Sequence, residues 1–165
     1  LSARRNLLVH ARLTGTDPAV IAPLLERVGL GGAGRKRAGS FSTGMKVRLS
    51  LAMALLNDPE VLILDEPQNG LDPQGIIELR DLVRNLADEG RTVIVVAHRL
   101  STVRQADEVV FLEPTEAGAR VAQRGTPQEL AAVPGPFREF IEASTASSRW
   151  HISTSPRKAY SAEGD

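Results

Sequence analysis

The sequence contains no cysteine, which excludes a disulfide framework and any metal site built on cysteine thiolates. The three histidines, His10, His98 and His151, lie far apart, without the short spacing typical of metal ligands. No apolar run reaches the length of a membrane-spanning helix, and no signal-peptide pattern opens the chain. These absences leave a soluble, cytoplasmic protein as the expectation.

An excess of charge of either sign is also absent, because 20 Lys and Arg balance 20 Asp and Glu. A dominant contact with nucleic acid through bulk charge is therefore excluded, and we expect no nucleic-acid partner. The basic run at residues 35–37 is typical of a solvated loop. With 165 residues and an apolar content of 42%, the chain is expected to form one modest globular domain.

A phosphate-binding P-loop, G-x-x-x-x-G-K-[ST], is missing as well. Its nearest match runs from Gly29 to Gly34 and is followed by Arg35 and Lys36, with no Ser or Thr. The same glycines, with Gly31, also spell G-x-G-x-x-G. That motif should follow a strand and open an apolar helix, whereas a helical pattern precedes it here and a basic run follows it. The segment is predicted to be a flexible loop.

The most informative feature that is present is VLILDEP at residues 61–67. Its apolar run predicts a strand buried on both faces, as in a parallel sheet covered by helices. Burial of carboxylates is costly, so Asp65 and Glu66 are expected at the carboxyl end of the strand, where parallel sheets bind ligands. There, one carboxylate can hold Mg²⁺ and the other can orient or deprotonate a water. The alternative is a strand that ends in a solvated acidic turn.

Upstream of this strand, residues 41–45 read FSTGM, and apolar residues recur at helical spacing over 46–56. Ser42 is the expected N-cap of this helix. Together with Gly44 it would offer a hydroxyl, backbone N–H groups and the positive end of the helix dipole to an anion. The alternative is an ordinary capped helix.

Downstream of the strand, an Asn-Gly turn leads to Asp72 and Pro73, which are typical of a helix start. A second apolar strand is predicted at residues 92–97, and His98 closes it. A single histidine is more often structural than catalytic. At the carboxyl end of a strand in the same sheet as the two carboxylates, it becomes a candidate site residue.

In this order and at this spacing, the segments resemble the C-terminal half of an ABC transporter ATPase (nucleotide-binding) domain. Residues 41–45 resemble its signature loop, residues 61–66 its Walker B strand and catalytic glutamate, and residues 70–72 its D-loop. His98 falls where the family has its switch histidine. The resemblance covers residues 1–143, with features of drug- and antibiotic-resistance ATPases at the front and of multidrug exporters after His98.

The resemblance implies an α/β fold: an incomplete P-loop NTPase-like parallel sheet flanked by helices, with part of the helical subdomain. It implies an ATP-binding and ATP-hydrolysing subunit that uses ATP and Mg²⁺ to power transport, with export of a drug-like or peptide compound favoured. The implied partners are a second ABC ATPase domain, in a head-to-tail dimer, and a transmembrane permease. The permease would hold the subunit at the inner face of the cell membrane.

The resemblance also assigns roles to residues. Asp65 would support Mg²⁺, mostly through water, Glu66 would act as general base or orient the water, and His98 would contact the γ-phosphate. Ser42 and Gly44 would contact the ATP held by the partner domain, and Asp72 would couple the two sites. The residues assigned to nucleotide binding are Ser42, Thr43, Gly44, Met45 and Asp72.

Three positions depart from the pattern of the family. Thr43 stands where glycine is usual, and its β-branched side chain is expected to weaken the contact with phosphate. Met45 stands where glutamine is frequent. Gln68 replaces a small residue, and nothing in the sequence explains it.

Without a P-loop, this chain alone is expected to be inactive as an ATPase. The sequence starts with Leu1, and the glutamine loop of the family is missing too, so we expect either a segment of a complete ATPase or a natural half. In the second case the chain would be a non-catalytic interaction or regulatory module for an intact ABC ATPase. A third alternative, a DNA-repair ATPase of the structural-maintenance type, would normally show long heptad repeats, and this sequence shows none.

Three regions are expected along the chain. Residues 1–57 would form part of the helical subdomain with the signature loop and helix, residues 58–143 the C-terminal part of the ATPase core, and residues 144–165 a disordered tail. Within them the sequence predicts helices at 3–13, 18–28, 43–57, 73–89, 100–106, 127–132 and 136–143, and strands at 61–65, 92–97 and 108–112.

Overall fold

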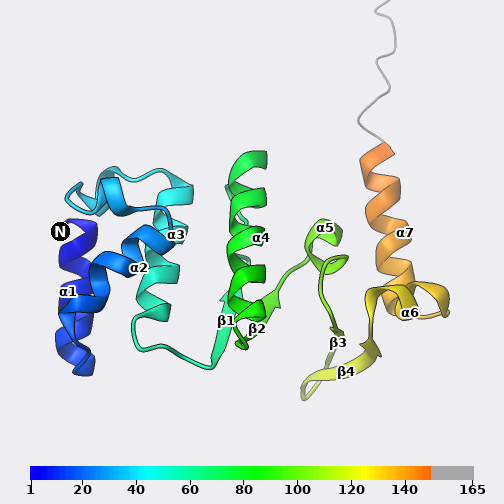
Figure 1. Cartoon of the computed structure of the whole chain (residues 1–165). Helices are drawn as coiled ribbons and strands as arrows, with labels where there is room; N and C mark the ends of the chain where they lie inside the picture. Colours follow the sequence, from blue (N-terminus) through cyan, green and yellow to red (C-terminus); the bar gives the residue numbers. More distant parts are fainter. Residues whose placement is uncertain (150–165) are drawn as a thin grey trace, which may run out of the picture. The chain divides into compact units, whose positions relative to one another are not determined.

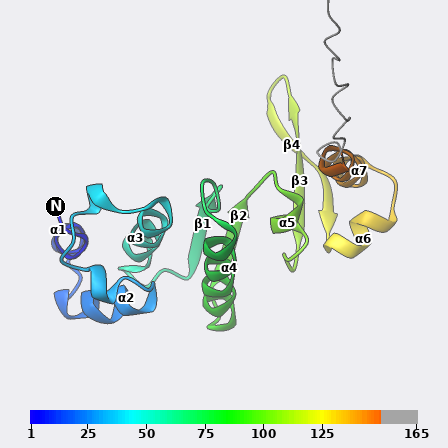
Figure 2. The ribbon, with the colours of Figure 1, turned by 90° about the horizontal axis from the view of Figure 1, so that it is seen from above.

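A computed structural model describes residues 1–149 of the chain. The chain divides into two compact units, Leu1–Val96 and Ala97–Asp165, the second described as far as residue 149. The elements of each unit are labelled in Figure 1, and Figure 2 gives a second view. No helix within the described residues combines the length and the apolar composition needed to span a membrane.

The first unit begins with a helical segment whose ends are set by local capping. Ser2 caps α1, its Oγ accepting a hydrogen bond from the Arg5 N–H at 3.3 Å. Gly15 ends the helix in the left-handed region that glycine adopts without penalty. The elements of this segment are α1 (Ala3–Thr14), η1 (Pro18–Val20), α2 (Ile21–Arg27), η2 (Gly31–Ala33), η3 (Ala38–Ser40) and α3 (Thr43–Leu55).

The sheet of the first unit has two parallel strands, β1 (Val61–Asp65) and β2 (Thr92–Val96), joined by α4 (Pro73–Asp88). Their register pairs Val61 with Thr92 and Asp65 with Val96, so the carboxyl ends of both strands lie side by side. This β-α-β unit is the parallel arrangement that alternation of strand and helix predicted.

A single hydrophobic core joins the helical segment to this sheet. Leu62 of β1 and the α4 residues Leu79 and Leu86 belong to the same buried cluster as the apolar residues of α1, α2 and α3. Burying a leucine side chain contributes about 1.5–3 kcal/mol, so this shared cluster is the main stabilising feature of the unit.

The prediction that β1 is buried on both faces is wrong for this structure. Leu62 is 3% exposed, whereas Ile63, which points to the opposite face, is 69% exposed. Val61, Ile94 and Val96 are also exposed. Within the first unit the sheet has two strands and its helices lie on one face, so no layer of this unit covers the apolar residues of the other face.

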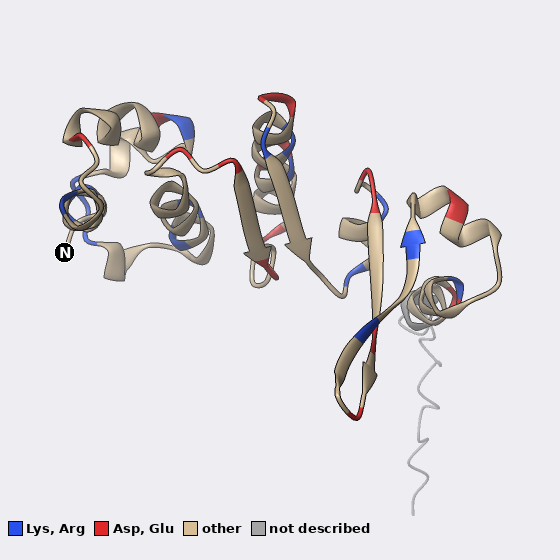
Figure 3. Cartoon of the chain, turned by 90° about the horizontal axis from the view of Figure 1, so that it is seen from below, with Lys and Arg blue, Asp and Glu red and all other residues tan. Residues whose placement is uncertain are grey.

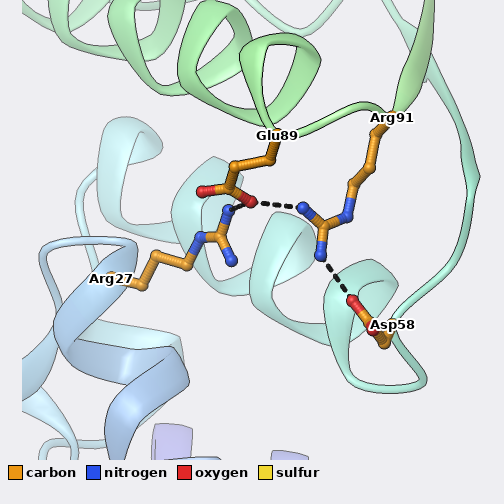
Figure 4. Close-up of polar contacts among 4 residues, drawn as sticks. All are labelled: Arg27, Asp58, Glu89 and Arg91. Carbon is orange, nitrogen blue, oxygen red and sulfur yellow. Dashed lines mark hydrogen bonds and ion pairs between the residues drawn. The ribbon is translucent and has the colours of Figure 1, made fainter.

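Charged side chains reinforce the junction between the helical segment and the sheet (Figure 4). Glu89, which follows α4, accepts hydrogen bonds from Arg27 of α2 and from Arg91, and Arg91 also pairs with Asp58. The hydrogen bond from Arg27 holds the pKa of Glu89 below its usual value, and the hydrogen bond to Asp58 raises the pKa of Arg91. Elsewhere, acidic and basic residues are spread over both units (Figure 3), and their formal charges balance over the whole chain.

The second unit packs two helices against a hairpin. Its elements are α5 (Leu100–Val103), β3 (Val109–Thr115), β4 (Gly118–Gly125), α6 (Pro127–Ala132) and α7 (Pro136–Arg149). The strands are antiparallel, with a register shift after Phe111. The ring of Phe111 meets that of Phe137 edge-on, with centroids 6.2 Å apart, in a core that also contains Val109 and Leu130.

The predicted boundary of the tail at residue 144 differs from the structure, because α7 continues to Arg149. Serine and threonine disfavour helix interiors only mildly, and Thr145 satisfies its hydroxyl by donating to the Ile141 carbonyl oxygen at 2.8 Å. The rest of the predicted tail, with Trp150 and Tyr160, lies outside the described residues.

Candidate functional site

The two carboxylates that follow β1 occupy different environments. Asp65 is the last residue of the strand and is exposed, while Glu66 is half-buried and one of its carboxylate oxygens, Oε2, is shielded from solvent. The Glu66 N–H donates to the Val96 carbonyl oxygen at 2.9 Å, which holds this residue beside the end of β2. The strand therefore ends in one solvated and one partly buried carboxylate.

The backbone of Glu66 adopts a conformation that is unusual for a residue with a side chain. Its φ of 44° lies in the left-handed region, which costs about 1–2 kcal/mol for a non-glycine residue. Such conformations persist when the surrounding structure fixes them, and they are frequent at functional sites. Here the carbonyl oxygen of Glu66 accepts from the Asn69 N–H at 3.1 Å, so the residue opens a hydrogen-bonded turn.

This turn connects β1 to α4 and contains Gln68, one of the three residues that depart from the pattern of the family. Gln68 is only 5% exposed, so it is a buried polar residue, and its backbone carbonyl oxygen accepts from the Leu71 N–H at 3.2 Å. Gly70 has a φ of 74°, as its place in a tight turn requires. The buried position of Gln68 could not be found from the sequence, because no periodicity marks a single buried polar residue in a turn.

Asp72 begins α4, and its predicted role as N-cap is confirmed. Its Oδ1 accepts a hydrogen bond from the Gly75 N–H at 2.9 Å, and Pro73 occupies the first helical position. The Asp72 side chain itself remains exposed.

Ser42 is the N-cap of α3, as predicted, with its Oγ accepting from the Met45 N–H at 3.3 Å. Ser42 and Thr43 are exposed, and Gly44 and Met45 are half-buried. The first turn of α3 contains no acidic residue, so nothing there opposes an anion at the positive end of this 13-residue helix.

The structure brings this helix start against the turn that follows Glu66. A Cβ atom built on Gly70 would lie 3.2 Å from the Cγ2 methyl of Thr43, and one on Gly44 would lie 3.6 Å from the Leu71 Cδ2. The two segments are far apart in sequence, and the shared hydrophobic core described above is what holds them together. The site residues from Ser42 to Asp72 thus belong to one unit.

His98 belongs to the second unit. β2 ends at Val96, one residue earlier than predicted, and His98 follows two residues later as an exposed residue of the second unit.

The glycine-rich loop does not offer a second phosphate site. The carboxylate of Glu26 fills the space beside Gly31 in which a Cβ atom would lie. A carboxylate in that place would repel a phosphate. The structure therefore agrees with the interpretation of residues 29–34 as a loop rather than a phosphate cradle, although η2 gives it one helical turn.

The donor set at the end of β1 fits Mg²⁺ in one particular way. Within residues 1–149 no group of three or more His, Asp or Glu side chains is arranged to hold a metal ion. Mg²⁺ bound together with a nucleotide, however, takes only one or two carboxylates and completes its shell with waters and phosphate oxygens. The exposed carboxylate of Asp65, with Glu66 beside it, meets that requirement.

The sequence is similar to several known proteins. The family model described as "ABC transporter" matches residues 2–69. The chain is 45% identical over 113 residues to the lantibiotic transport ATP-binding protein SrtF of Streptococcus pyogenes, covering 68% of this chain and 49% of SrtF. It is 50% identical over 107 residues to the bacitracin transport ATP-binding protein BcrA of Bacillus licheniformis, covering 64% of this chain and 35% of BcrA.

The fold has a counterpart among solved structures. A bacterial Atm1-family ABC exporter with ATP bound matches with a TM-score of 0.70 at 22% identity, covering 93% of this chain and 27% of the exporter chain. The chain therefore spans half or less of the length of the relatives quoted above.

Proposed function

Because this chain belongs to the family of ABC transporter ATP-binding proteins, we propose that it serves two ATPase sites of a dimer that powers export through a membrane permease. Its signature loop would act on the ATP of the partner domain, its Walker B residues on the ATP of its own domain, and its D-loop would couple the two sites. The observation that carries the proposal is the contact of the start of α3 with the turn that follows Asp65 and Glu66. Residues with complementary roles toward a nucleotide thereby share one unit.

In the proposed reaction, Glu66 orients or deprotonates the water that attacks the γ-phosphate of ATP. Its place beside the carboxyl end of β1, the edge at which parallel sheets bind ligands, supports this role. Asp65, at the exposed end of β1, would hold Mg²⁺ directly or through water. When bound, Mg²⁺ would neutralise charge on the phosphate oxygens.

The start of α3 would bind the γ-phosphate of the ATP that a second ATPase domain holds in a head-to-tail dimer. The hydroxyl of Ser42 and the backbone of Thr43, Gly44 and Met45 would approach the γ-phosphate, helped by the helix dipole. Asp72 would couple the two sites across the dimer. His98, from the second unit, would stabilise charge on the γ-phosphate during transfer.

The P-loop has to come from outside these 165 residues, because they contain none. We propose that it comes from a preceding segment of a complete ATPase domain, and that this chain alone does not turn over ATP. The same absence supports a second candidate function, in which the chain is a non-catalytic partner that offers its signature loop to an intact ABC ATPase.

The transported compound is proposed from the relatives. SrtF is named for lantibiotic transport and BcrA for bacitracin transport. Export of a peptide or drug-like compound is therefore the favoured function. The ATPase would be cytoplasmic, held at the inner face of the cell membrane by its permease.

The test is the Glu66→Gln variant of a complete protein that contains both this chain and a P-loop. Loss of the base is expected to lower turnover by about 10²–10⁴-fold while ATP affinity stays near native, because binding relies on the P-loop. Turnover is measured by phosphate release, and affinity by titration with a fluorescent ATP analogue. Glu60→Gln, an exposed residue just before β1, is the matched control and should keep native turnover. Native turnover in Glu66→Gln would remove Glu66 from the catalytic role.

A further inference from the structure

The contact between Thr43 and Gly70 gives the site a feature that the roles proposed above do not use. The Thr43 Cγ2 methyl lies 3.2 Å from the place of a Cβ on Gly70, with Cβ and Oγ1 of Thr43 each 4.0 Å away. The methyl group therefore fills the space that the missing side chain of Gly70 leaves open. The fit depends on both residues, a threonine at one position and a glycine at the other.

Thr43 is also the position at which this chain departs from the glycine that is usual in the family. A glycine there would have no side chain to reach Gly70, so this packing is a property of the present sequence. Threonine is β-branched and has few rotamers, which makes it a stiffer spacer than serine.

A second contact, about one turn further along α3, ties this helix to α4. Arg48 of α3 donates from Nη1 to the Val28 carbonyl oxygen at 3.1 Å and forms an ion pair with Glu78 of α4. With the packing of Gly44 against Leu71, α3 and the segment leading into α4 contact each other at several levels. A displacement of the start of α3 is therefore expected to displace the turn before α4.

From Gly70 the connection to Glu66 is short. The Asn69 N–H donates to the Glu66 carbonyl oxygen at 3.1 Å, so Asn69 closes the turn that Glu66 opens, and Gly70 is the next residue. The left-handed conformation of Glu66 has to be maintained by its surroundings, and this turn is part of them.

We propose that Thr43 is a positioning residue whose methyl group holds the turn at residues 66–70, so that the start of α3 and the Glu66 carboxylate keep a fixed geometry. Phosphate bound by one end of this unit would then set the orientation of the base at the other end. This inference rests on the proposed function, because it describes how that ATPase site is held together.

The test is a double-mutant cycle in the complete, P-loop-containing protein, with native, Thr43→Ser, Gly70→Ala and the double variant. Gly70→Ala places a methyl group against Thr43 and is expected to lower kcat about tenfold with little change in KM for ATP. Thr43→Ser removes the opposing methyl, so Gly70→Ala in the Thr43→Ser background should lower kcat only about twofold. The effects of Gly70→Ala in the two backgrounds would then differ by about fivefold, which is the coupling between the two residues. The left-handed strain of an alanine at position 70 is the same in both backgrounds and cancels.

Controls separate positioning from general loss of structure. Gly15→Ala, at a φ of 73° with no atom within 4 Å of its Cβ position, carries the same strain without a neighbour and should be additive with Thr43→Ser. Unfolding temperatures are measured for every variant. If Gly70→Ala does not fold, Thr43→Val, which keeps the methyl group, must turn over ATP faster than Thr43→Ser.

Coupling in kcat supports the proposal. Additive kcat values, coupling confined to the unfolding temperature, or a Thr43→Val variant no faster than Thr43→Ser overturns it and leaves the proposed function intact. A complete native protein that binds ATP but does not hydrolyse it overturns both.

Discussion

Two neighbouring residues of β1 provide a direct measure of how the sheet is covered. Leu62 is 3% exposed and belongs to the core shared with α4, whereas Ile63 is 69% exposed on the opposite face. Truncation of each to alanine removes a similar aliphatic side chain from the same strand. The intrinsic cost of alanine in a strand affects both variants alike, so the difference between them reports burial.

The expected magnitudes follow from this exposure. Leu62→Ala removes buried methyl groups and leaves a cavity, which costs about 2–5 kcal/mol. Ile63 has about a third of its surface buried, so the same truncation should lose about a third of the 1.5–3 kcal/mol of full burial, or roughly 0.5–1 kcal/mol. The two variants should therefore differ by more than about 1 kcal/mol in the free energy of unfolding.

The assay is urea unfolding of the 165-residue chain, followed by circular dichroism at several protein concentrations. Equal losses for the two variants, independent of concentration, would refute the burial pattern of β1. If Ile63→Ala instead costs as much as Leu62→Ala only at high concentration, another copy of the chain covers the apolar face in solution. In a complete protein in which further structure covers that face, Ile63→Ala should lower the free energy of unfolding by more than it does in the 165-residue chain.

Two further predictions concern local electrostatics and capping. Because its ion pair with Arg27 lowers the pKa of Glu89, Glu89 contributes stability at neutral pH that is lost as the pH falls through this lowered value. The gap in urea midpoint between native protein and Glu89→Gln should therefore close between pH 7 and pH values below 4.5, and a gap that stays constant would contradict the ion pair. Thr126→Ala removes the N-cap of α6 and its reciprocal bond with Glu129, and should destabilise the second unit by about 1 kcal/mol. The α6 amides should exchange hydrogen faster in Thr126→Ala than in the native protein, and at the native rate in the control Gln128→Ala. Native exchange rates in both variants would contradict the prediction.

Much of the local structure could be predicted because it depends on signals a few residues long. The strand at 61–65 and the helix at 127–132 have the predicted bounds, and the starts of α3 and α4 were marked by Ser42 and by Asp72 with Pro73. Capping and turn residues act on their own neighbours, so the sequence contains the whole cause.

Features that depend on distant partners could not be predicted. The apolar run of β1 indicated two buried faces, but which face is covered depends on the number of strands and helices around it. The packing of Thr43 on Gly70 has no signal in either segment alone. The roles of Asp65, Glu66 and His98 in catalysis stay predictions. The resemblance to ABC transporter ATPases supports all three, and the place of the two carboxylates at the end of β1 supports theirs.

The parallel pairing of β1 with β2 has a consequence for biosynthesis. β1 leaves the ribosome well before its partner strand, because the whole of α4 lies between them. During that interval its backbone donors and acceptors and its apolar side chains are open to other nascent chains. The helices before β1 have mainly local contacts and can already be formed, and they offer Leu62 a surface to dock on. Slowing translation within the codons for α4 would therefore lengthen the time for which β1 is exposed.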